Sequence, residues 1–244
     1  MGRFYFDLHL HSCLSPCADD DMTPGNIAGM GSLAGLNVMA LTDHNSARNC
    51  PAFFAQCENL GITAVAGMEL TTSEDIHVVC LFEDINDALR FDKEVYGRLI
   101  KFKNREDVYG KQMILDENDE VINEEEYLLS VATDISYDDA FSLVAEYNGI
   151  VFPAHIDREA NGVVSTLGTL PDTPDFPCIE LYHIEKAEEY GTRFPKIKEK
   201  PIVTGSDAHF LTAIRDASVY FEADAVGSEK IRKALFKFLK GERP

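Results

Sequence analysis

A segment near the start of the chain places one aspartate and two histidines at alternating positions. Within residues 4–12, aromatic and branched side chains alternate with Asp7, His9 and His11. This period of two is typical of a β-strand, and side chains two residues apart share one strand face. Two imidazoles and a carboxylate that converge at a strand end suit a divalent metal ion. Hydrogen bonds at the rim of a sheet explain the His-x-His pair by itself equally well, so the rest of the chain must decide.

The composition limits the classes of protein to which the chain can belong. Its 244 residues, 45% of them hydrophobic, allow a sizeable core and predict one domain with an insertion. No run approaches the roughly 18 apolar residues of a membrane-spanning helix, and the first residues enter a strand instead of the apolar region of a signal peptide. We therefore expect a cytoplasmic protein with no membrane partner.

Charge and cysteine content bear on the partners. The net charge of −20 argues against an extended nucleic-acid surface, because such surfaces need clustered lysines and arginines. It leaves room for an anionic substrate, since bound cations invert the local field.

The chain has six cysteines and no Cys-x-x-Cys pair, which favours reduced thiols. Cys13 and Cys17 lie near the metal candidates in sequence, so a thiolate ligand is an open alternative.

Strands and helices alternate along most of the chain. After the first strand, apolar runs predict strands at 37–42, 62–70, 75–82, 150–155, 179–183 and 201–209. We expect helices at 24–35, 51–60, 137–147 and from Ser228 onwards, the first with Thr23 as its N-cap and Pro24 at its first position. This alternation predicts an α/β fold with a largely parallel sheet, with polar residues at the carboxyl ends of the strands.

Residues 85–134 interrupt the alternation. A basic helix at 88–103 is followed by an acidic turn at 116–120 between two apolar segments, and the whole stretch contributes no histidine. We interpret it as an insertion whose charges pair with one another in solvent. A lid over the site is the alternative, and a lid would favour small substrates over long nucleic acids.

Six of the seven histidines fall at or near the ends of the expected strands, with acidic residues in equivalent positions. Histidines scattered through a core would not keep that register. The histidines are His9, His11, His44, His77, His155 and His209, and the acidic residues are Asp7, Asp43, Glu69 and Asp207. His183 also ends a strand, but its flanking residues favour a position in the wall of the site. The pattern as a whole favours a metal centre.

Several motifs together resemble the polymerase and histidinol phosphatase (PHP) superfamily of metal-dependent phosphoesterases. They are Asp-Leu-His-Leu-His-Ser at 7–12, Leu-Thr-Asp-His-Asn at 41–45, Gly-Met-Glu at 67–69, His77 within its strand, His-Ile-Asp-Arg at 155–158 and Gly-Ser-Asp-Ala-His at 205–209. The resemblance implies a single PHP domain over residues 1–244. It also implies a distorted (β/α)7 TIM-like barrel with a trinuclear metal site at the carboxyl ends of the strands. The mostly helical insertion at about 85–134 interrupts the family's spacing.

The resemblance also implies a role for each candidate ligand. The first ion would be held by His9, His11, Glu69 and Asp207. Glu69 would bridge to a second ion held by His77 and His155, and His44 and His209 would hold a third with an aspartate. Asp7 and Asp43 would orient the imidazoles.

The aspartate of the third ion is where this sequence departs from the family. The usual Ser-Asp-Gly is replaced by Ser-Pro-Cys-Ala at 15–18. Asp19 keeps the family's distance to Pro24 and is preferred, with Asp20 as the next candidate. Cys17 is a further alternative.

Nitrogen and oxygen ligands suit two to three divalent ions of zinc, manganese or iron. The resemblance implies hydrolysis of a phosphomonoester of a small metabolite or nucleotide, with a hydroxide held between cations as the nucleophile. Arg158, Glu69 and His209 would be the catalytic residues, and Arg158 would neutralise phosphate oxygens unless it only pairs with Asp157 or Glu159.

Two alternatives keep the fold but change the function. An amidohydrolase-like C–N hydrolase would use a carboxylated lysine between its metal ions, and no expected strand ends in a suitable lysine. A non-catalytic PHP module, as found within polymerases, would tend to lose ligands that this chain keeps.

Overall fold

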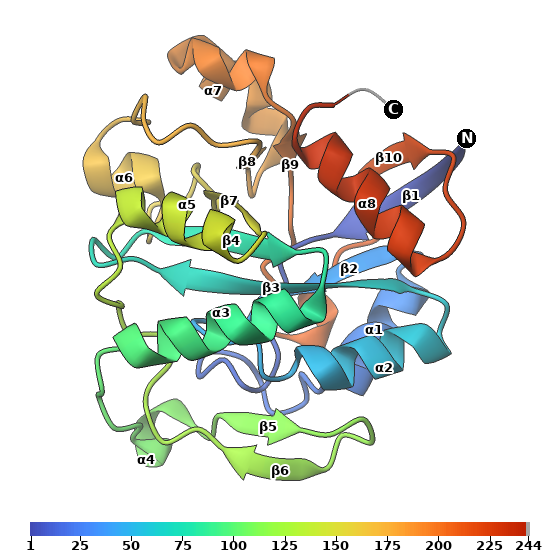
Figure 1. Cartoon of the computed structure of the whole chain (residues 1–244), viewed down its shortest axis with the longest axis vertical. Coiled ribbons are helices and arrows are strands. Elements are labelled where there is room, and N and C mark those ends of the chain that lie inside the picture. Colours follow the sequence, from blue (N-terminus) through green and yellow to red (C-terminus); the bar gives the residue numbers. More distant parts are fainter. Residues whose placement is uncertain (243–244) are drawn as a thin grey trace.

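The computed structural model describes residues 1–242 and contains a curled six-stranded sheet flanked by helices (Figure 1). The strand order is β10-β1-β2-β3-β4-β7. The bounds are β1 (Gly2–Asp7), β2 (Val38–Leu41), β3 (Thr63–Thr71), β4 (His77–Phe82), β7 (Ile150–Pro153) and β10 (Tyr220–Ala223). The sheet forms a half-barrel, so the expected α/β fold of the distorted TIM-barrel type is confirmed.

The sheet is mixed and not largely parallel as expected. β1, β2 and β3 run parallel to one another, whereas β4 is antiparallel to both β3 and β7, and β10 is antiparallel to β1. The reason lies after β3, where only residues 72–76 separate it from β4. A parallel crossover needs about a dozen residues or more, so β4 turns back beside β3.

Apolar side chains cover both faces of the sheet. All nine residues of β3 are buried, as expected for a strand that packs on both sides. One face packs against α1 (Pro24–Leu33), α2 (Cys50–Asn59), α3 (Ile85–Arg98) and α5 (Tyr137–Glu146). The other face packs against α8 (Ser228–Leu239), through residues such as Leu235 and Phe236. Figure 1 shows α3 running alongside β3.

The expected helix starts follow local capping chemistry. The hydroxyl of Thr23 accepts a hydrogen bond from the backbone N–H of Asn26, and Pro24 occupies the first turn of α1. Ser136 caps α5 in the same way by accepting from the N–H of Asp139. These bonds satisfy backbone donors that the first turn leaves unpaired, which is why both helices begin where the sequence predicts.

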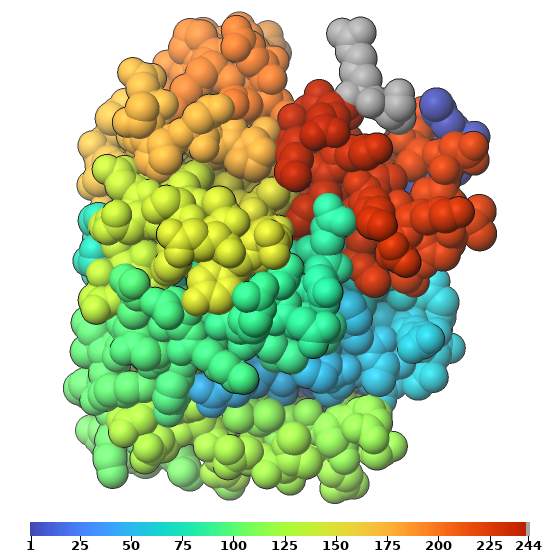
Figure 2. Space-filling view, in the orientation of Figure 1, coloured from blue at the N-terminus to red at the C-terminus, as the bar shows by residue number. Residues whose placement is uncertain are grey.

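The insertion contains α3, the short α4 (Glu106–Tyr109) and a hairpin of β5 (Met113–Leu115) and β6 (Val121–Glu124). The acidic turn at 116–120 joins the two hairpin strands. The charges on α3 pair with one another, as in Arg98–Glu94 at 2.8 Å, while Phe91 is buried in the core. Figure 2 shows the insertion forming the lower part of this face of the molecule.

The rest of the chain supplies small elements that complete the molecule. They are α6 (Val163–Leu167), α7 (Ala187–Arg193) and a two-stranded parallel sheet of β8 (Ile179–Glu180) and β9 (Ile202–Val203). Within residues 1–242, no helix has the length and apolar character needed to cross a membrane.

Candidate metal centre

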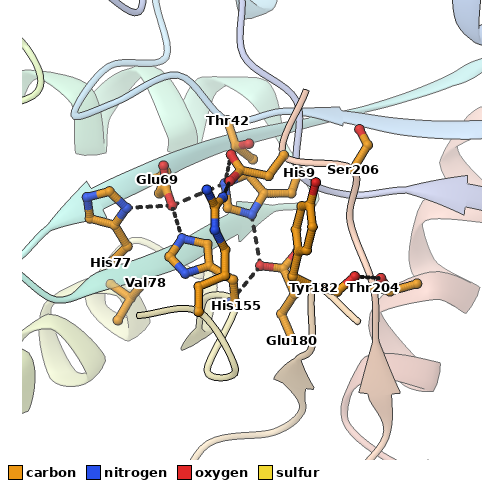
Figure 3. A network of polar contacts seen from close by, with 12 residues as sticks. His9, Thr42, Glu69, His77, Val78, His155, Glu180, Tyr182, Thr204 and Ser206 are labelled. Atoms are coloured by element: carbon orange, nitrogen blue, oxygen red, sulfur yellow. Dashed lines mark hydrogen bonds and ion pairs between the residues drawn. The ribbon is translucent and has the colours of Figure 1, made fainter. Parts of the chain in front are cut away.

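Glu69 lies at the centre of a cluster of five histidines. It is almost fully buried, with 1% of its side chain exposed. One carboxylate oxygen lies 2.9–3.2 Å from ring nitrogens of His77, His155 and His9. The other lies 3.1 Å from His44 and 3.3 Å from His11. Figure 3 shows His9, His77 and His155 gathered around Glu69.

Asp207 adds a second carboxylate on the other side of the cluster. Its Oδ1 lies 3.2 Å from Nε2 of His11, and 3.6 Å from ring nitrogens of both His9 and His209.

Asp207 has a φ of 50° and His155 a φ of 27°, a backbone region that side chains with a Cβ rarely adopt. Such strain persists where surrounding contacts hold it, often at functional sites.

Strand directions explain why these residues meet. β1, β2 and β3 are parallel, so the residues that follow them lie at one edge of the sheet. β4 runs the opposite way, and its first residue, His77, pairs with Thr71 at the end of β3. His77 therefore reaches the same edge from the amino end of its strand, whereas the metal site as a whole was expected at the carboxyl ends of the strands. His155 follows β7, which runs in the direction of β3.

Ring nitrogens in the cluster are buried and lack hydrogen-bond partners. Those of the described residues are Nε2 of His9 and His11 and Nδ1 of His44 and His155. Buried polar atoms are almost always paired. The unpaired nitrogens of His9, His11 and His44 lie beside the carboxylate of Glu69, an arrangement that fits bound cations. The potential ligands form three groups, and within each group the ligand atoms lie within 4.8 Å of one another. The groups are His9, His11, Glu69 and Asp207; His44, Glu69 and His77; and His11, His44 and His209.

Hydrogen bonds behind the cluster fix the ring orientations. Nδ1 of His9 donates to the buried carboxylate of Glu180 over 2.9 Å, and Nδ1 of His209 donates to the carbonyl oxygen of Asp207 over 2.8 Å. Each bond leaves the opposite ring nitrogen, Nε2, free for a cation.

His11 is positioned through an intermediate serine. Its Nδ1 lies 3.1 Å from the hydroxyl of Ser15, which in turn donates to Asp43 over 2.7 Å. Asp43 therefore orients an imidazole indirectly. Asp7 does not contact an imidazole ring; it accepts hydrogen bonds from the backbone N–H groups of His9 and Ser206.

Glu180 is a site residue that the sequence analysis missed. It lies at the end of a short strand, as the other ligands do, but no histidine or motif adjoins it directly. Its role depends on a contact with His9, 171 positions away. The position at a strand end was the one available signal.

The charges of the cluster stabilise one another. Burial opposes ionisation of Glu69, yet the imidazoles around it, that of His77 first, hold its pKa well below the usual value. Burial also opposes protonation of His9, but three carboxylates, that of Glu180 first, raise its pKa well above the usual value. Protons and cations therefore compete for the same nitrogens.

A pocket of about 140 Å³ opens onto the cluster. Its wall includes Arg158, which is 42% exposed and pairs with Asp207, and Asn161. Arg158 thus pairs with neither Asp157 nor Glu159, and its guanidinium lies 5.0 Å from the ring centre of Tyr182. Because the guanidinium of Arg158 is partly exposed and lines the pocket, it can reach a ligand bound there.

The insertion supports this site from the side and does not line the pocket. None of the pocket-lining residues lies within 85–134. Asn45, next to His44, donates to the carbonyl oxygens of Leu129 and Val131 over 2.7 and 2.9 Å. The backbone N–H of Met113 donates to the carbonyl of Cys13 over 3.1 Å. The insertion therefore braces the loops that carry the ligands.

Comparison with known families explains the cluster. A family model described as the PHP domain matches residues 7–162, more than half of the chain. The chain belongs to the PHP domain family. The resemblance seen in the sequence is therefore confirmed, and family and cluster together support a metal-dependent hydrolase. No curated protein matches the chain.

Solved structures share the fold of this PHP domain. The endonuclease Q of Pyrococcus furiosus has a TM-score of 0.70 at 18% identity, covering 98% of this chain and 56% of that one. A protein of Bifidobacterium adolescentis described as a metal-dependent phosphoesterase has a TM-score of 0.60 at 16% identity, covering 95% and 96%. This PHP domain spans little more than half the length of endonuclease Q.

The comparison corrects the expectation about partners. A second endonuclease Q structure, with a TM-score of 0.65 at 17% identity, covers 98% of this chain and 57% of that one. It is a complex with a 27-mer duplex that has an abasic lesion at the active site. The expectation of a small phosphorylated partner to the exclusion of nucleic acid is therefore wrong. Net charge is a poor guide here because cations bound at such a site would reverse the local field.

The aspartates expected to complete the third ligand group of this PHP domain lie outside it. Asp19 and Asp20 are exposed and belong to none of the three groups. Cys17, the other alternative, also belongs to none of the three groups. Burial would raise the pKa of its thiol, but the charges of the His44 and His209 imidazoles outweigh burial and lower this pKa to about 5.

Proposed function

We propose that this PHP domain is a phosphoesterase that uses two to three divalent ions. The observation that carries the proposal is the convergence of five histidines on buried Glu69, with Arg158 in the wall of the same pocket. Imidazole and carboxylate ligands suit zinc, manganese or iron, and a guanidinium is a preferred partner of phosphate oxygens.

The ligand groups suggest how the ions are distributed. We assign His9, His11, Glu69 and Asp207 to the first ion, since their ligand atoms lie within 4.8 Å of one another. We assign His77 and His155 to the second, with Glu69 bridging, because one oxygen of Glu69 lies 2.9 Å and 3.1 Å from their ring nitrogens. His44 lies in one group with Glu69 and His77 and in another with His11 and His209, and we assign it with His209 to the third position.

The chain's own residues bind and orient the substrate. Bound divalent ions supply Lewis acidity, which lowers the pKa of water toward neutrality and polarises phosphoryl oxygens. Arg158 exchanges Asp207 for a phosphoryl oxygen and stabilises the charge that develops there. Glu180 and Ser15 hold His9 and His11 in one orientation, so the ligand set is formed before the substrate arrives.

We propose a phosphomonoester as the reacting group, because the pocket of about 140 Å³ can enclose a terminal phosphate against Arg158. Cleavage of a phosphodiester in DNA is the second candidate, favoured by the similarity to endonuclease Q. A C–N hydrolase with a carboxylated lysine is disfavoured, since no lysine is among the described residues that line the pocket and Glu69 takes the bridging position.

The test is a substrate screen with the metal-loaded protein. Phosphomonoesters, 5′-phosphorylated oligonucleotides and duplexes with an abasic site are incubated with zinc, manganese or iron, and released phosphate and strand cleavage are measured. We expect metal-dependent release of phosphate that Glu69→Gln abolishes. Strand cleavage without phosphate release would favour the second candidate. Neither product from any ester, with ions shown to be bound, would overturn the proposal.

A further inference from the structure

We propose that Tyr182 is a positioning residue that holds the guanidinium of Arg158 in place for the phosphoryl group. Tyr182 lies two residues after Glu180, and its ring stands at the border of the cluster (Figure 3). It is not among the residues that line the pocket, so it would act through Arg158 and not on the substrate. The inference rests on the proposed function, in which Arg158 binds a phosphoryl oxygen.

The guanidinium of Arg158 has two partners of different kinds. One is the carboxylate of Asp207, to which it donates a hydrogen bond. The other is the ring of Tyr182, whose centre lies 5.0 Å from the guanidinium carbon. A cation within about 6 Å of a ring centre is attracted by the electrons of the ring face. This second contact leaves the N–H groups of Arg158 free, so it does not compete with a phosphoryl oxygen for them.

The two oxygens of Asp207 have separate partners. Oδ1 lies 3.2 Å from Nε2 of His11 and 3.6 Å from Nε2 of His9, whereas Oδ2 accepts from Arg158. A phosphoryl oxygen that replaces Oδ2 therefore leaves Oδ1 with the ligand group. Of the two contacts of Arg158, the one with Tyr182 persists during this exchange. Without it, a long side chain would have to be ordered by the substrate, at a cost in conformational entropy.

Hydrogen bonds join Tyr182 to the segment that carries Arg158. The backbone N–H of Tyr182 donates to Oδ1 of Asp157 over 2.7 Å, and the backbone N–H of His183 donates to Oδ2 over 3.0 Å. Asp157 is buried and directly precedes Arg158 in the chain. One carboxylate thus connects the two loops, which fixes the ring and the guanidinium relative to each other.

Arg215 holds Tyr182 from a third segment. Its Nη1 donates to the carbonyl oxygen of Tyr182 over 3.0 Å and to the hydroxyl of Thr204 over 3.2 Å. Its guanidinium carbon also lies 4.3 Å from the centre of the Tyr182 ring. Tyr182 is therefore held at both its backbone and its ring, as a residue that positions another side chain must be.

The test is a double-mutant cycle on the metal-loaded full chain, with the substrate found in the screen and with inorganic phosphate as a ligand. We expect Tyr182→Leu to lower kcat/KM by about 3- to 30-fold, the range that a cation–π contact contributes, and to weaken phosphate binding by a similar factor. Tyr182→Phe keeps the ring face and should restore both. In an Arg158→Ala background, Tyr182→Leu should cause no further loss, because the contact is already absent.

Two controls separate this role from a general structural one. All variants should keep the metal content of the native protein by elemental analysis. Tyr109→Leu makes the same change at an exposed tyrosine of the insertion and should alter neither kcat/KM nor phosphate binding. Tyr182→Gln, which also lacks a ring, repeats the measurement if Tyr182→Leu fails to fold.

Native phosphate binding and native kcat/KM in Tyr182→Leu would overturn the proposal. An equal loss with and without Arg158 would overturn it as well, since the ring would then not act through the guanidinium. Weaker phosphate binding in Tyr182→Leu, in a protein that hydrolyses no ester, would keep the role of Tyr182 and refute the proposed function. Ester hydrolysis that Tyr182→Leu leaves unchanged would refute only the role of Tyr182.

Discussion

The carboxylate of Glu180 accepts a hydrogen bond from Nδ1 of His9 over 2.9 Å, and the same oxygen accepts the backbone N–H of His155 over 3.0 Å. One buried oxygen thus orients two residues of the proposed metal centre. It fixes the ring of His9 and supports the strained backbone of His155, whose φ is 27°. Glu180 is therefore a positioning residue for the first and second ions.

Removing Glu180 should weaken metal binding without removing a ligand. We expect Glu180→Ala to lower the affinity for metal by about 10- to 100-fold, as loss of such outer partners does elsewhere, with Glu180→Gln in between because it keeps one acceptor oxygen. Titration with a chelating indicator measures the affinity. Glu185→Ala, at an exposed glutamate, is the control, and equal affinities for the Glu180 and Glu185 variants would contradict the assignment.

Replacing Glu69 should affect two ions together. Glu69→Gln substitutes a neutral amide for the bridging carboxylate, and its NH₂ group then faces imidazoles that need an acceptor or a cation. We expect a loss of about two ions per chain by elemental analysis, with the fold retained by circular dichroism. Glu58→Gln, at an exposed position on α2, should keep all ions. Full ion content in Glu69→Gln would remove Glu69 from the bridging role.

Arg158 should affect catalysis and not metal content. We expect Arg158→Ala to lower kcat on the substrate found in the screen by about 100-fold or more, the scale seen when one charge-stabilising donor is lost. The exposed Arg193→Ala should have little effect. Unchanged kcat/KM in Arg158→Ala would reduce Arg158 to an ion-pair partner of Asp207.

Gly205 is required by a close approach of three segments. A Cβ at this position would lie 2.4 Å from Cβ of His9 and 2.5 Å from Oε1 of Glu180. We expect Gly205→Ala to lower the free energy of unfolding by about 1–3 kcal/mol and to weaken metal binding. Gly97→Ala on α3 is the matched control, because no atom lies within 4 Å of its Cβ, and it should raise helix stability by up to about 1 kcal/mol. Denaturant titration compares the two, and equal stabilities would contradict the steric argument.

The thiol of Cys17 should react selectively in the metal-free protein. Its pKa is lowered to about 5, whereas burial raises the pKa of Cys13 and Cys50 to about 12. A lowered pKa means that the reactive thiolate is present above about pH 5 and is lost only below it. Alkylation by iodoacetamide, mapped by mass spectrometry, should therefore be flat from about pH 7 to 9 at Cys17. In denatured protein the rate should rise with pH through about 8.5, and the same rise in the folded protein would contradict the lowered pKa.

Local patterns in the sequence predicted most of the elements and most of the cluster. The alternation of residues placed the side chains of His9 and His11 on one face of a strand. The Thr23-Pro24 pair predicted the start of α1, which begins at Pro24. These features depend on neighbours a few residues apart, where periodicity and capping chemistry act directly. The motifs then indicated the family through their resemblance to it in type and order.

Only the tertiary structure decided the features that depend on distant segments. The antiparallel direction of β4 brings His77 to the site from the amino end of its strand. The hydrogen bond between His9 and Glu180 joins residues 171 positions apart. Asp19 was preferred as a ligand for its distance along the chain to Pro24, yet its side chain is exposed and belongs to none of the ligand groups. Sequence spacing sets which side chains share a local face, whereas the meeting of loops from separate strands is set by packing of the whole sheet.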